Sequence, residues 1–388
     1  MGPNLVRLGT RKQSGAQGDS FSAADLRHMK TCLRLARRGA GRTSPNPMVG
    51  SVVVRSGIVV GKGYHRAAGL PHAEVEALRQ AGEKARGGAL YVSLEPCNIF
   101  GRTPPCTDLI LSCGVKEVVC AILDPNPRVN GKGMDVLRRG RVRVRVGLLQ
   151  EEARRLNEAW FCYMERGRPF VTLKAAASWD GKIATRGRDR GWLTSEDSRR
   201  VVHRMRSEAD AVLVGIGTVL NDDPLLTVRA CRPKRHGFPM RVVLDSEARL
   251  PLSSRLALTA REVPVLVACT DAAAARRRSQ LEAAGVETVA LKAGAEGGVD
   301  LTSLLIYLAG REIVSVLLEG GASLNWSFLE SGLVDKVCLF LAPLLLGGKE
   351  APTVADGAGV GALTEAWRFA RTEYRRVETD LLLTGWLH

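Results

Sequence analysis

The 388-residue sequence is poor in aromatic residues, at 5%, and has only 40 acidic residues against 56 lysines and arginines. It also lacks a long apolar run, since stretches such as residues 313–318 and 337–343 fall far short of the roughly 20 residues that span a membrane. An apolar share of 45% is ordinary for a folded protein and argues against disorder over most of the chain. We therefore expect a soluble, globular protein with no membrane partner.

Cysteine is also sparse. The nine cysteines are too few for a disulfide scaffold in a chain of this length, and their odd number also argues against full pairing. The N-terminus lacks the charged, apolar and cleavable layout of a secretory signal. We expect residues 1–21 to form a flexible extension, with a short organellar transit peptide as the alternative. The chain is expected to be cytoplasmic, with reduced thiols.

The net charge of +16 fits two classes of partner, a nucleic acid or a phosphorylated small molecule. The most regular basic run, residues 141–146, alternates arginine and valine. This alternation predicts an edge strand with one buried face and three arginines in solvent. No aromatic residue is interleaved for base stacking, which argues against a nucleic-acid surface there.

Apolar, β-rich runs alternate with helical patterns in the first half of the chain. Residues 25–37 place apolar side chains at helical spacing, and Gly39 and Gly41 end this helix. Such alternation of strands and helices favours a sheet covered by helices. The other predicted elements are strands at residues 49–54, 89–94 and 117–123 and helices at residues 73–85 and 107–112.

A helical pattern at residues 151–164 ends at an R-G-R-P segment, residues 166–169, where we place a domain boundary. The chain then divides into two α/β units, residues 22–168 and residues 169–388. The predicted strands of the second unit are residues 170–174, 211–214, 241–244, 263–268, 313–318 and 336–341.

The strongest chemical signal in the sequence is a set of metal-ligand residues in the first half. His72 offers an imidazole, and Cys97 and Cys106 offer thiolates. Three ligands with a fourth position open are typical of a catalytic zinc. Glu74, two residues after His72, is placed to move a proton between zinc-bound water and a leaving amine. The pattern H-x-E followed by P-C is that of zinc deaminases, although the cysteines here are nine positions apart.

The alternative is that His72 is a surface histidine and that both cysteines are ordinary buried thiols. The combination of a histidine that opens a helix with a cysteine that follows a strand favours the zinc site. The remaining cysteines lack partner spacing and are expected to be buried small hydrophobes. These are Cys32, Cys113, Cys120, Cys162, Cys231, Cys269 and Cys338.

Two glycine-containing turns stand out in the second half, at residues 213–218 and 317–323. Each follows a strand, and such a turn exposes backbone N–H groups to a phosphate at a helix N-terminus. Neither matches G-x-G-x-x-G, so the Rossmann fingerprint is absent. The alternative is that glycine merely gives these tight turns their backbone freedom.

Five segments give the first half a specific signature: S-P-N-P-M-V-G at 44–50, P-H-A-E-V at 71–75, L-E-P-C at 94–97, G-R-T-P-P-C at 101–106 and D-P-N-P at 124–127. This half resembles the deaminase half of the bifunctional riboflavin-biosynthesis deaminase/reductase family, which has the longer cysteine spacing. The resemblance implies a cytidine-deaminase-like α/β/α sandwich that binds zinc. It also implies that Asn46, His65 and Arg102 line the substrate pocket.

Segments of the second half follow the reductase half of the same family in order: residues 171–178, 180–183, 192–195, 210–215, 221–224, 226–229 and 318–321. The resemblance implies a dihydrofolate-reductase-like α/β domain that uses NADPH. By position, the cofactor residues would be Ala176, Trp192, Thr218, Asp222, Ser246, Gly321, Ala322, Ser323, Leu324, Asn325, Trp326 and Ser327. The substrate residues would be Arg190, Arg206, Leu226, Arg229 and Glu319.

The residue types suit this chemistry. The forked side chains of Arg206 and Arg229 can bind a substrate phosphate, although both could instead be solvated surface charges. Lys174 and Asp222 are candidate proton donors for hydride transfer to the opened sugar, with a structural lysine at a strand end as the alternative for Lys174. The chain departs from the family pattern at position 99, where isoleucine replaces a histidine, and at position 190, where arginine replaces a serine.

The resemblance implies two reactions on a phosphorylated pyrimidine. A 2,5-diamino-6-(ribosylamino)pyrimidinone 5′-phosphate would lose a ring amine as ammonia, and its ribosyl group would then be reduced to ribityl, giving 5-amino-6-(ribitylamino)uracil 5′-phosphate. The expected partners are this small molecule and further copies of the chain, without nucleic acid. The alternative is a tRNA or nucleotide base deaminase with a degenerate reductase-like domain.

Overall fold

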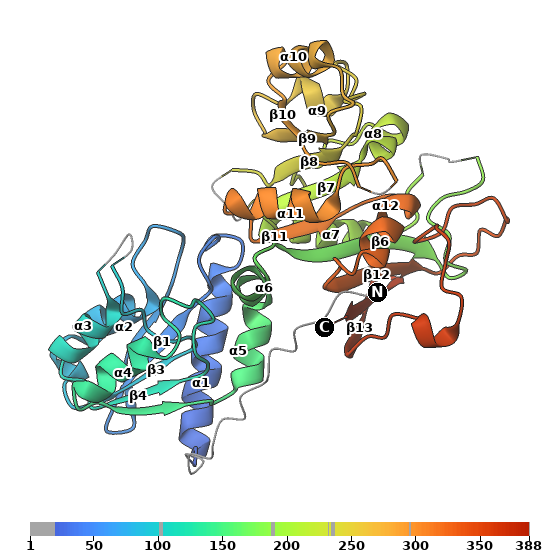
Figure 1. Cartoon of the computed structure of the whole chain (residues 1–388). Coiled ribbons are helices and arrows are strands. Elements are labelled where there is room, and N and C mark those ends of the chain that lie inside the picture. Colours follow the sequence, from blue (N-terminus) through green and yellow to red (C-terminus); the bar gives the residue numbers. More distant parts are fainter. Residues whose placement is uncertain are drawn as a thin grey trace, which may run out of the picture.

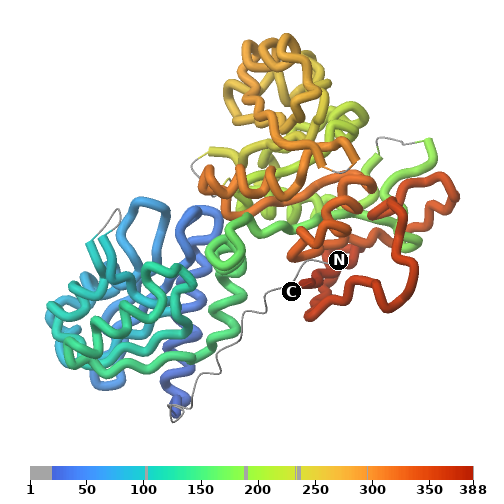
Figure 2. Tube along the Cα trace, in the orientation of Figure 1, coloured from blue at the N-terminus to red at the C-terminus, as the bar shows by residue number. Residues whose placement is uncertain are grey.

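The computed structural model describes residues 20–100, 104–187, 191–231, 233, 237–294 and 296–387. Two lobes follow one another along the chain, as the colour gradient in Figures 1 and 2 shows. Residues 1–19, which make up nearly all of the expected N-terminal extension, lie outside the described residues. No helix in the described part of the chain is long and apolar enough to cross a membrane.

The first lobe is built on a five-stranded sheet in the order β2-β1-β3-β4-β5. The β1–β2 and β1–β3 pairs are antiparallel, whereas β3, β4 and β5 run parallel. The strands are β1 (Gly50–Arg55), β2 (Ile58–Tyr64), β3 (Ala89–Val92), β4 (Glu117–Cys120) and β5 (Arg143–Val146).

Helices cover both faces of this sheet and so form the expected α/β/α sandwich. On one face, Met29 of α1 and Phe161 of α6 pack against Val52 and Val119. On the other face, α2, α3 and α4 pack against Leu90 and the neighbouring strand residues. The helices are α1 (Ala23–Ala36), η1 (Arg37–Gly39), α2 (Ala73–Ala81), η2 (Gly82–Ala85), α3 (Cys106–Ser112), α4 (Lys132–Arg139), α5 (Gln150–Leu156) and α6 (Glu158–Arg166).

The second lobe is built on a nine-stranded sheet in the order β10-β9-β8-β7-β11-β6-β12-β14-β13. The first seven strands in this order, from β10 through β12, run parallel to one another. The C-terminal strands β14 and β13 add an antiparallel edge. The strands are β6 (Phe170–Ser178), β7 (Ala211–Gly215), β8 (Met240–Leu244), β9 (Val265–Cys269), β10 (Glu287–Ala290), β11 (Ser315–Leu318), β12 (Lys336–Ala342), β13 (Arg371–Val377) and β14 (Asp380–Trp386).

Helices also lie on both faces of the larger sheet. Leu304 of α11 and Phe328 of α12 belong to one apolar core, whereas Val219 of α8 and Leu281 of α10 belong to another. The helices are α7 (Glu196–Glu208), α8 (Ile216–Asp222), α9 (Arg255–Leu258), α10 (Ala275–Ala283), α11 (Leu301–Gly310), α12 (Ala322–Glu330) and η3 (Leu363–Glu365). The described residues thus form the two α/β domains that the sequence predicts.

Polar contacts join the two domains near the linker. Arg168 Nη1 and Nη2 donate to the carboxylate of Asp335 at 2.7 and 2.8 Å. Glu158 of α6 accepts from Lys336 Nζ and from Trp386 Nε1, both at 2.7 Å. The predicted single helix at residues 151–164 is two helices, α5 and α6, separated at Asn157.

Three further sequence predictions need correction. Strands β2, β10, β13 and β14 were not predicted. The basic run is an edge strand, as expected, but Arg145 is only 6% exposed and contacts the carboxylates of Asp25 and Glu117 at 3.1 and 2.8 Å. Its burial is possible because two acids pair with it. Among the seven thiols expected to be buried, Cys113 and Cys231 are half-exposed.

Candidate active sites

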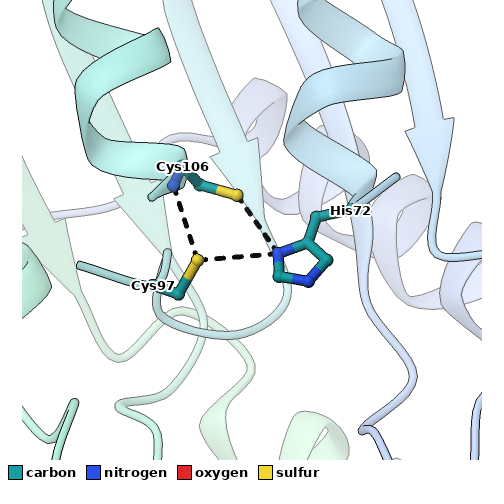
Figure 3. Close-up of side chains that lie close together, drawn as sticks. All are labelled: His72, Cys97 and Cys106. Carbon is teal, nitrogen blue, oxygen red and sulfur yellow. Dashed lines mark hydrogen bonds between the residues drawn. The ribbon is translucent and has the colours of Figure 1, made fainter. Parts of the chain in front are cut away.

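The three predicted metal ligands converge in the first domain (Figure 3). His72 is the N-cap residue of α2, Cys97 lies in the loop after β3, and Cys106 is the first residue of α3. His72 Nδ1 lies 3.3 Å from Cys106 Sγ and 3.6 Å from Cys97 Sγ. Two helix starts and one strand-to-helix loop therefore bring the ligands together from positions up to 34 residues apart.

The cluster fits a zinc ion. Zn–S and Zn–N bonds of ordinary length imply ligand atoms about 3.5–3.8 Å apart in a tetrahedron, close to the observed separations. Hydrogen bonding with Cys106 and then with His72 lowers the pKa of the Cys97 thiol, which favours the thiolate that zinc binds. Among the described residues the ligand group contains these three side chains, so a fourth position is left for water.

Glu74 lies beside the cluster without belonging to it, as the sequence predicts. Its side chain is 3% exposed, on the first turn of α2. Burial raises the pKa of Glu74 to about 7, and the nearby His72 partly opposes this rise. A carboxylate with a pKa in this range can both accept and return a proton near neutral pH.

Asn46 and His65, which the resemblance assigns to substrate, also lie next to the metal ligands. Asn46 Nδ2 is 3.2 Å from His65 Nε2, and the His65 ring meets the His72 ring edge-on with centroids 5.4 Å apart. Burial lowers the pKa of His65, which favours the neutral form of its ring. Arg102, the third expected substrate residue, lies outside the described residues.

Sequence reasoning gave no role to Glu95, which lies two residues before the candidate zinc ligand Cys97. Its carboxylate is 4% exposed and accepts four backbone N–H groups of the 124–134 segment at 2.9–3.3 Å. Gly133 is required there, because a Cβ atom would lie 2.2 Å from the carbonyl oxygen of Pro96. The only local signal was an acid directly before Pro-Cys.

A second cluster of predicted residues lies in the reductase-like domain. Glu319, which follows β11, accepts hydrogen bonds from Arg206 Nε at 2.6 Å and Arg206 Nη2 at 2.9 Å. Lys174 Nζ of β6 lies 3.4 Å from the same carboxylate. Arg206 and Glu319 are nearly buried, so the alternative of a solvated Arg206 is wrong. Lys174 lies inside β6, which continues to Ser178, and therefore does not end the strand.

The other expected substrate residues have different surroundings. Leu226 is buried, with a φ of 53°. Arg229 is exposed, and its backbone N–H donates to His203 Nδ1 at 3.2 Å. Asp222, the second candidate proton donor, is exposed at the end of α8. Arg190 lies outside the described residues.

Both predicted glycine turns lie at the carboxyl edge of the large sheet, where the parallel strands β7 and β11 are neighbours. A Cβ on Gly320 would lie 2.9 Å from Asn325 Oδ1, so the second turn depends on glycine. The Thr218 hydroxyl lies close to Gly321, 3.9 Å from where a Cβ would be. The two turns therefore meet and place Thr218 beside the N-terminus of α12.

The remaining expected cofactor residues have different surroundings. Ser246 lies two residues after the end of β8, and its carbonyl oxygen accepts from Thr270 N and Oγ1, both at 3.0 Å. Asn325 Nδ2 donates to the carbonyl oxygen of Val354 at 2.8 Å, while Asn325 Oδ1 is buried and has no hydrogen-bond partner among the described residues. Trp192 is 74% exposed beneath the guanidinium of Arg199. The others are Ala176 in β6 and Ala322, Ser323, Leu324, Trp326 and Ser327 in α12.

Two family models match the chain on either side of the linker. The cytidine and deoxycytidylate deaminase zinc-binding region matches residues 22–122, and the RibD C-terminal domain matches residues 169–383. The second match alone covers more than half of the chain. Together with the ligand cluster, these matches define a zinc-binding deaminase fused to a reductase, and the family's reductase uses NADPH.

Full-length relatives share this two-domain organisation. The riboflavin biosynthesis protein RibD of Aquifex aeolicus is 44% identical, with 92% of this chain and 97% of the relative covered. That of Escherichia coli is 39% identical, with 92% and 98% covered. The Acinetobacter baumannii RibD structure superposes with a TM-score of 0.84 at 36% identity, covering 94% of this chain and 98% of that one. The chain belongs to the RibD family of bifunctional deaminase/reductases of riboflavin biosynthesis.

The name of the protein in one further solved structure states two reactions. A Thermotoga maritima protein, a diaminohydroxyphosphoribosylaminopyrimidine deaminase/5-amino-6-(5-phosphoribosylamino)uracil reductase, superposes with a TM-score of 0.80. It is 34% identical, with 94% of this chain and 98% of that chain covered.

Proposed function

We propose that residues 22–168 deaminate a 2,5-diamino-6-(ribosylamino)pyrimidinone 5′-phosphate and that residues 169–388 then reduce its ribosyl group to ribityl with NADPH. The observation that carries this proposal is the pairing of the zinc-type cluster His72, Cys97 and Cys106 with the buried Glu74 in one domain and a buried cationic cluster in the other. The Thermotoga maritima relative supports the choice of substrate.

In the deaminase domain, a zinc ion held by His72, Cys97 and Cys106 would lower the pKa of a bound water toward neutrality. Glu74, whose carboxylate lies beside the ligand cluster, would accept a proton from the attacking water and return it to the departing ring amine. Asn46 and His65 orient the pyrimidinone ring, and Arg102 contacts the substrate as well.

In the reductase domain, bound NADPH supplies the hydride. Glu319 holds Arg206 and Lys174 in place through the contacts at 2.6–3.4 Å. Arg206, Arg229 and Arg190 bind the anionic end of the substrate, with Leu226 against its apolar part. Lys174 or Asp222 donates the proton that the opened sugar requires when hydride arrives.

The residues expected to bind NADPH would hold it at the carboxyl edge of the large sheet. The two meeting turns, which carry Thr218 and Gly321, present backbone N–H groups to its phosphates. The residues expected to complete the site are Ala176, Trp192, Asp222, Ser246, Ala322, Ser323, Leu324, Asn325, Trp326 and Ser327.

The proposed partner is the small phosphorylated pyrimidine, not a nucleic acid, and the proposed compartment is the cytoplasm. None of the nine cysteines, all of which lie within the described residues, forms a disulfide, in keeping with a reducing compartment. We also propose a homo-oligomer. The edge strand β13 supports this, since Tyr374 is 80% exposed on it. Light scattering at two protein concentrations measures the mass of the assembly.

The function is tested with the purified chain and the diaminopyrimidinone substrate by following ammonia release and NADPH oxidation separately. Both signals are expected. Glu74→Gln should abolish ammonia release while zinc remains bound, and the deaminated substrate should still be reduced. Ammonia release without NADPH oxidation contradicts the reductase assignment, and silence in both assays contradicts the whole proposal. A base deaminase acting on tRNA would instead bind RNA with a steep dependence on salt.

A further inference from the structure

The loop at residues 43–49 of the deaminase domain is held at two points. Near its start, the hydroxyl of Ser44 donates to Asp210 Oδ2 at 2.8 Å, and Asp210 belongs to the reductase domain. Near its end, the backbone of Met48 is bracketed by the side chain of Asn157. Met48 N donates to Asn157 Oδ1 at 2.8 Å, and Asn157 Nδ2 donates to Met48 O at 2.9 Å.

The reductase domain fixes the acceptor of the first contact. Asp210 is 2% exposed and directly precedes β7. The oxygen that accepts from Ser44 also accepts the backbone N–H groups of Val314 and Ser315 at 2.9 and 3.0 Å. These residues lead into β11, the neighbour of β7. The sheet of the reductase domain therefore sets the position of the carboxylate that Ser44 contacts.

Asn46 lies between the two anchors along the chain and contacts His65, whose ring meets that of the zinc ligand His72. Its amide lies 3.2 Å from His65 Nε2. His65 Nδ1 in turn lies 3.2 Å from the carbonyl oxygen of Pro71, the residue before the zinc ligand His72. A short chain of contacts thus runs from the reductase sheet through Ser44 to the deaminase site.

We propose that the reductase domain positions the substrate loop of the deaminase domain, with Ser44 and Asp210 as positioning residues that act through Asn46. This inference rests on the proposed contact of Asn46 with substrate. Fusing the two domains then serves the first reaction directly, because the deaminase loop has its full set of contacts only against the reductase sheet.

Another contact between the domains lies outside residues 43–49. The hydroxyl of Tyr163 in α6 donates to the carbonyl oxygen of Ala309 at the end of α11, at 3.1 Å. Tyr163→Phe removes an interdomain hydrogen bond of the same chemical kind as Ser44→Ala. The pair of variants separates a general weakening of the interface from a specific effect on the 43–49 loop.

The experiment compares Ser44→Ala, Ser44→Thr and Tyr163→Phe in the full chain loaded with zinc. Ser44→Ala should raise the KM of deamination about tenfold, the scale of one hydrogen bond to a charged acceptor. Ser44→Thr keeps the hydroxyl and should restore the KM, whereas Tyr163→Phe should leave it unchanged. The reductase KM for the deaminated substrate should stay the same in all three, because Val314 and Ser315 continue to hold Asp210.

An unchanged deaminase KM in Ser44→Ala overturns the proposal, as does an equal rise in Tyr163→Phe or in Ser44→Thr. Asn46→Ala and the double variant Ser44→Ala/Asn46→Ala complete a double-mutant cycle. If Ser44 acts through Asn46, the double variant should be no worse than Asn46→Ala alone, and additive effects contradict this route. An unimpaired Asn46→Ala overturns the proposed substrate contact itself, so the two failures are distinguishable.

Discussion

Arg206 and Glu319 form a two-pronged ion pair inside the reductase domain, with Arg206 Nε and Nη2 at 2.6 and 2.9 Å from the two carboxylate oxygens. The side chains are 12% and 7% exposed, and Lys174 adds a second cation at 3.4 Å. Two cations thus depend on a single buried anion. The stability of this site is therefore sensitive to the charge of Glu319.

Neutralising this anion should destabilise the reductase domain. Glu319→Gln leaves the buried Arg206 and Lys174 without a counter-charge, a change that typically costs about 3–5 kcal/mol. The exposed pair of Glu196 and Arg200 on α7 gives a matched control, since Glu196→Gln should cost less than about 1 kcal/mol. Urea unfolding of the full-length variants measures both values. Equal shifts in the two midpoints would contradict the importance of burial.

The same carboxylate predicts a pH dependence of stability. Burial by itself raises the pKa of Glu319, but Arg206 and Lys174 outweigh it and lower the value from 4.5 to about 2. Its charged form therefore stabilises the fold above about pH 4.5, and this contribution, about 3 kcal/mol, is lost as the pH falls toward 2. The free energy of unfolding, measured from pH 6 to pH 3, should fall less steeply in Glu319→Gln than in the unaltered chain.

Two arginines of the four-residue edge strand β5 differ in burial. The side chain of Arg145 is 8% exposed and contacts Asp25 and Glu117, whereas that of Arg143 is 71% exposed. Arg145→Leu should destabilise the deaminase domain by about 3–5 kcal/mol, since Asp25 would be buried without its cation. Arg143→Leu should change stability by less than about 1 kcal/mol. Thermal unfolding of both variants decides whether only one of these arginines supports the fold.

The sequence predicts that β5 is an edge strand with alternating faces, because that depends only on the period of the pattern. It does not predict which arginine is buried, because Asp25 lies 120 residues away and is brought close by packing of α1. The helix break at Asn157 has the same origin. No proline or glycine marks it, and the side chain of Asn157 instead contacts Met48, 109 residues earlier.

Local chemistry explains which site residues were predictable. The zinc ligands and Glu74 belong to short motifs whose residue types state their role, so their assignment needs no knowledge of packing. The strand β13 was missed for the opposite reason, since its T-E-Y-R-R run is polar and its extended form comes from pairing with β14. Glu95 and Asp210 were missed because the backbone groups that they bind lie 29 to 105 residues away.

Two half-exposed cysteines of the deaminase domain allow a matched test of the metal site. Cys97→Ser replaces a proposed zinc ligand and should lower zinc content and ammonia release together. Cys113→Ser lies outside the ligand cluster and should leave both unchanged. A chelator should likewise stop ammonia release by the unaltered chain while reduction of the deaminated substrate continues. Zinc content by atomic absorption and the two separate assays provide the measurements, and a metal-loaded, active Cys97→Ser would refute the ligand assignment.

Glu95 should hold the zinc loop in place without touching the metal. One of its oxygens accepts from Asp124 N and Gly131 N, and the other accepts from Gly133 N and Met134 N. Glu95→Gln turns an NH₂ group toward one pair of these donors, so about two buried N–H groups lose their acceptor at about 1–3 kcal/mol each.

The proposed zinc ligand Cys97 follows Glu95 by two residues, so this loss should reach the metal site. Glu95→Gln should lower the melting temperature of the deaminase domain and release zinc to a competing chelator faster than the unaltered chain does. Glu152→Gln, at an exposed position on α5, is the matched control and should change neither quantity. If Glu95→Gln melts earlier but holds zinc as firmly as the control, the carboxylate supports the 124–134 segment alone and does not position Cys97.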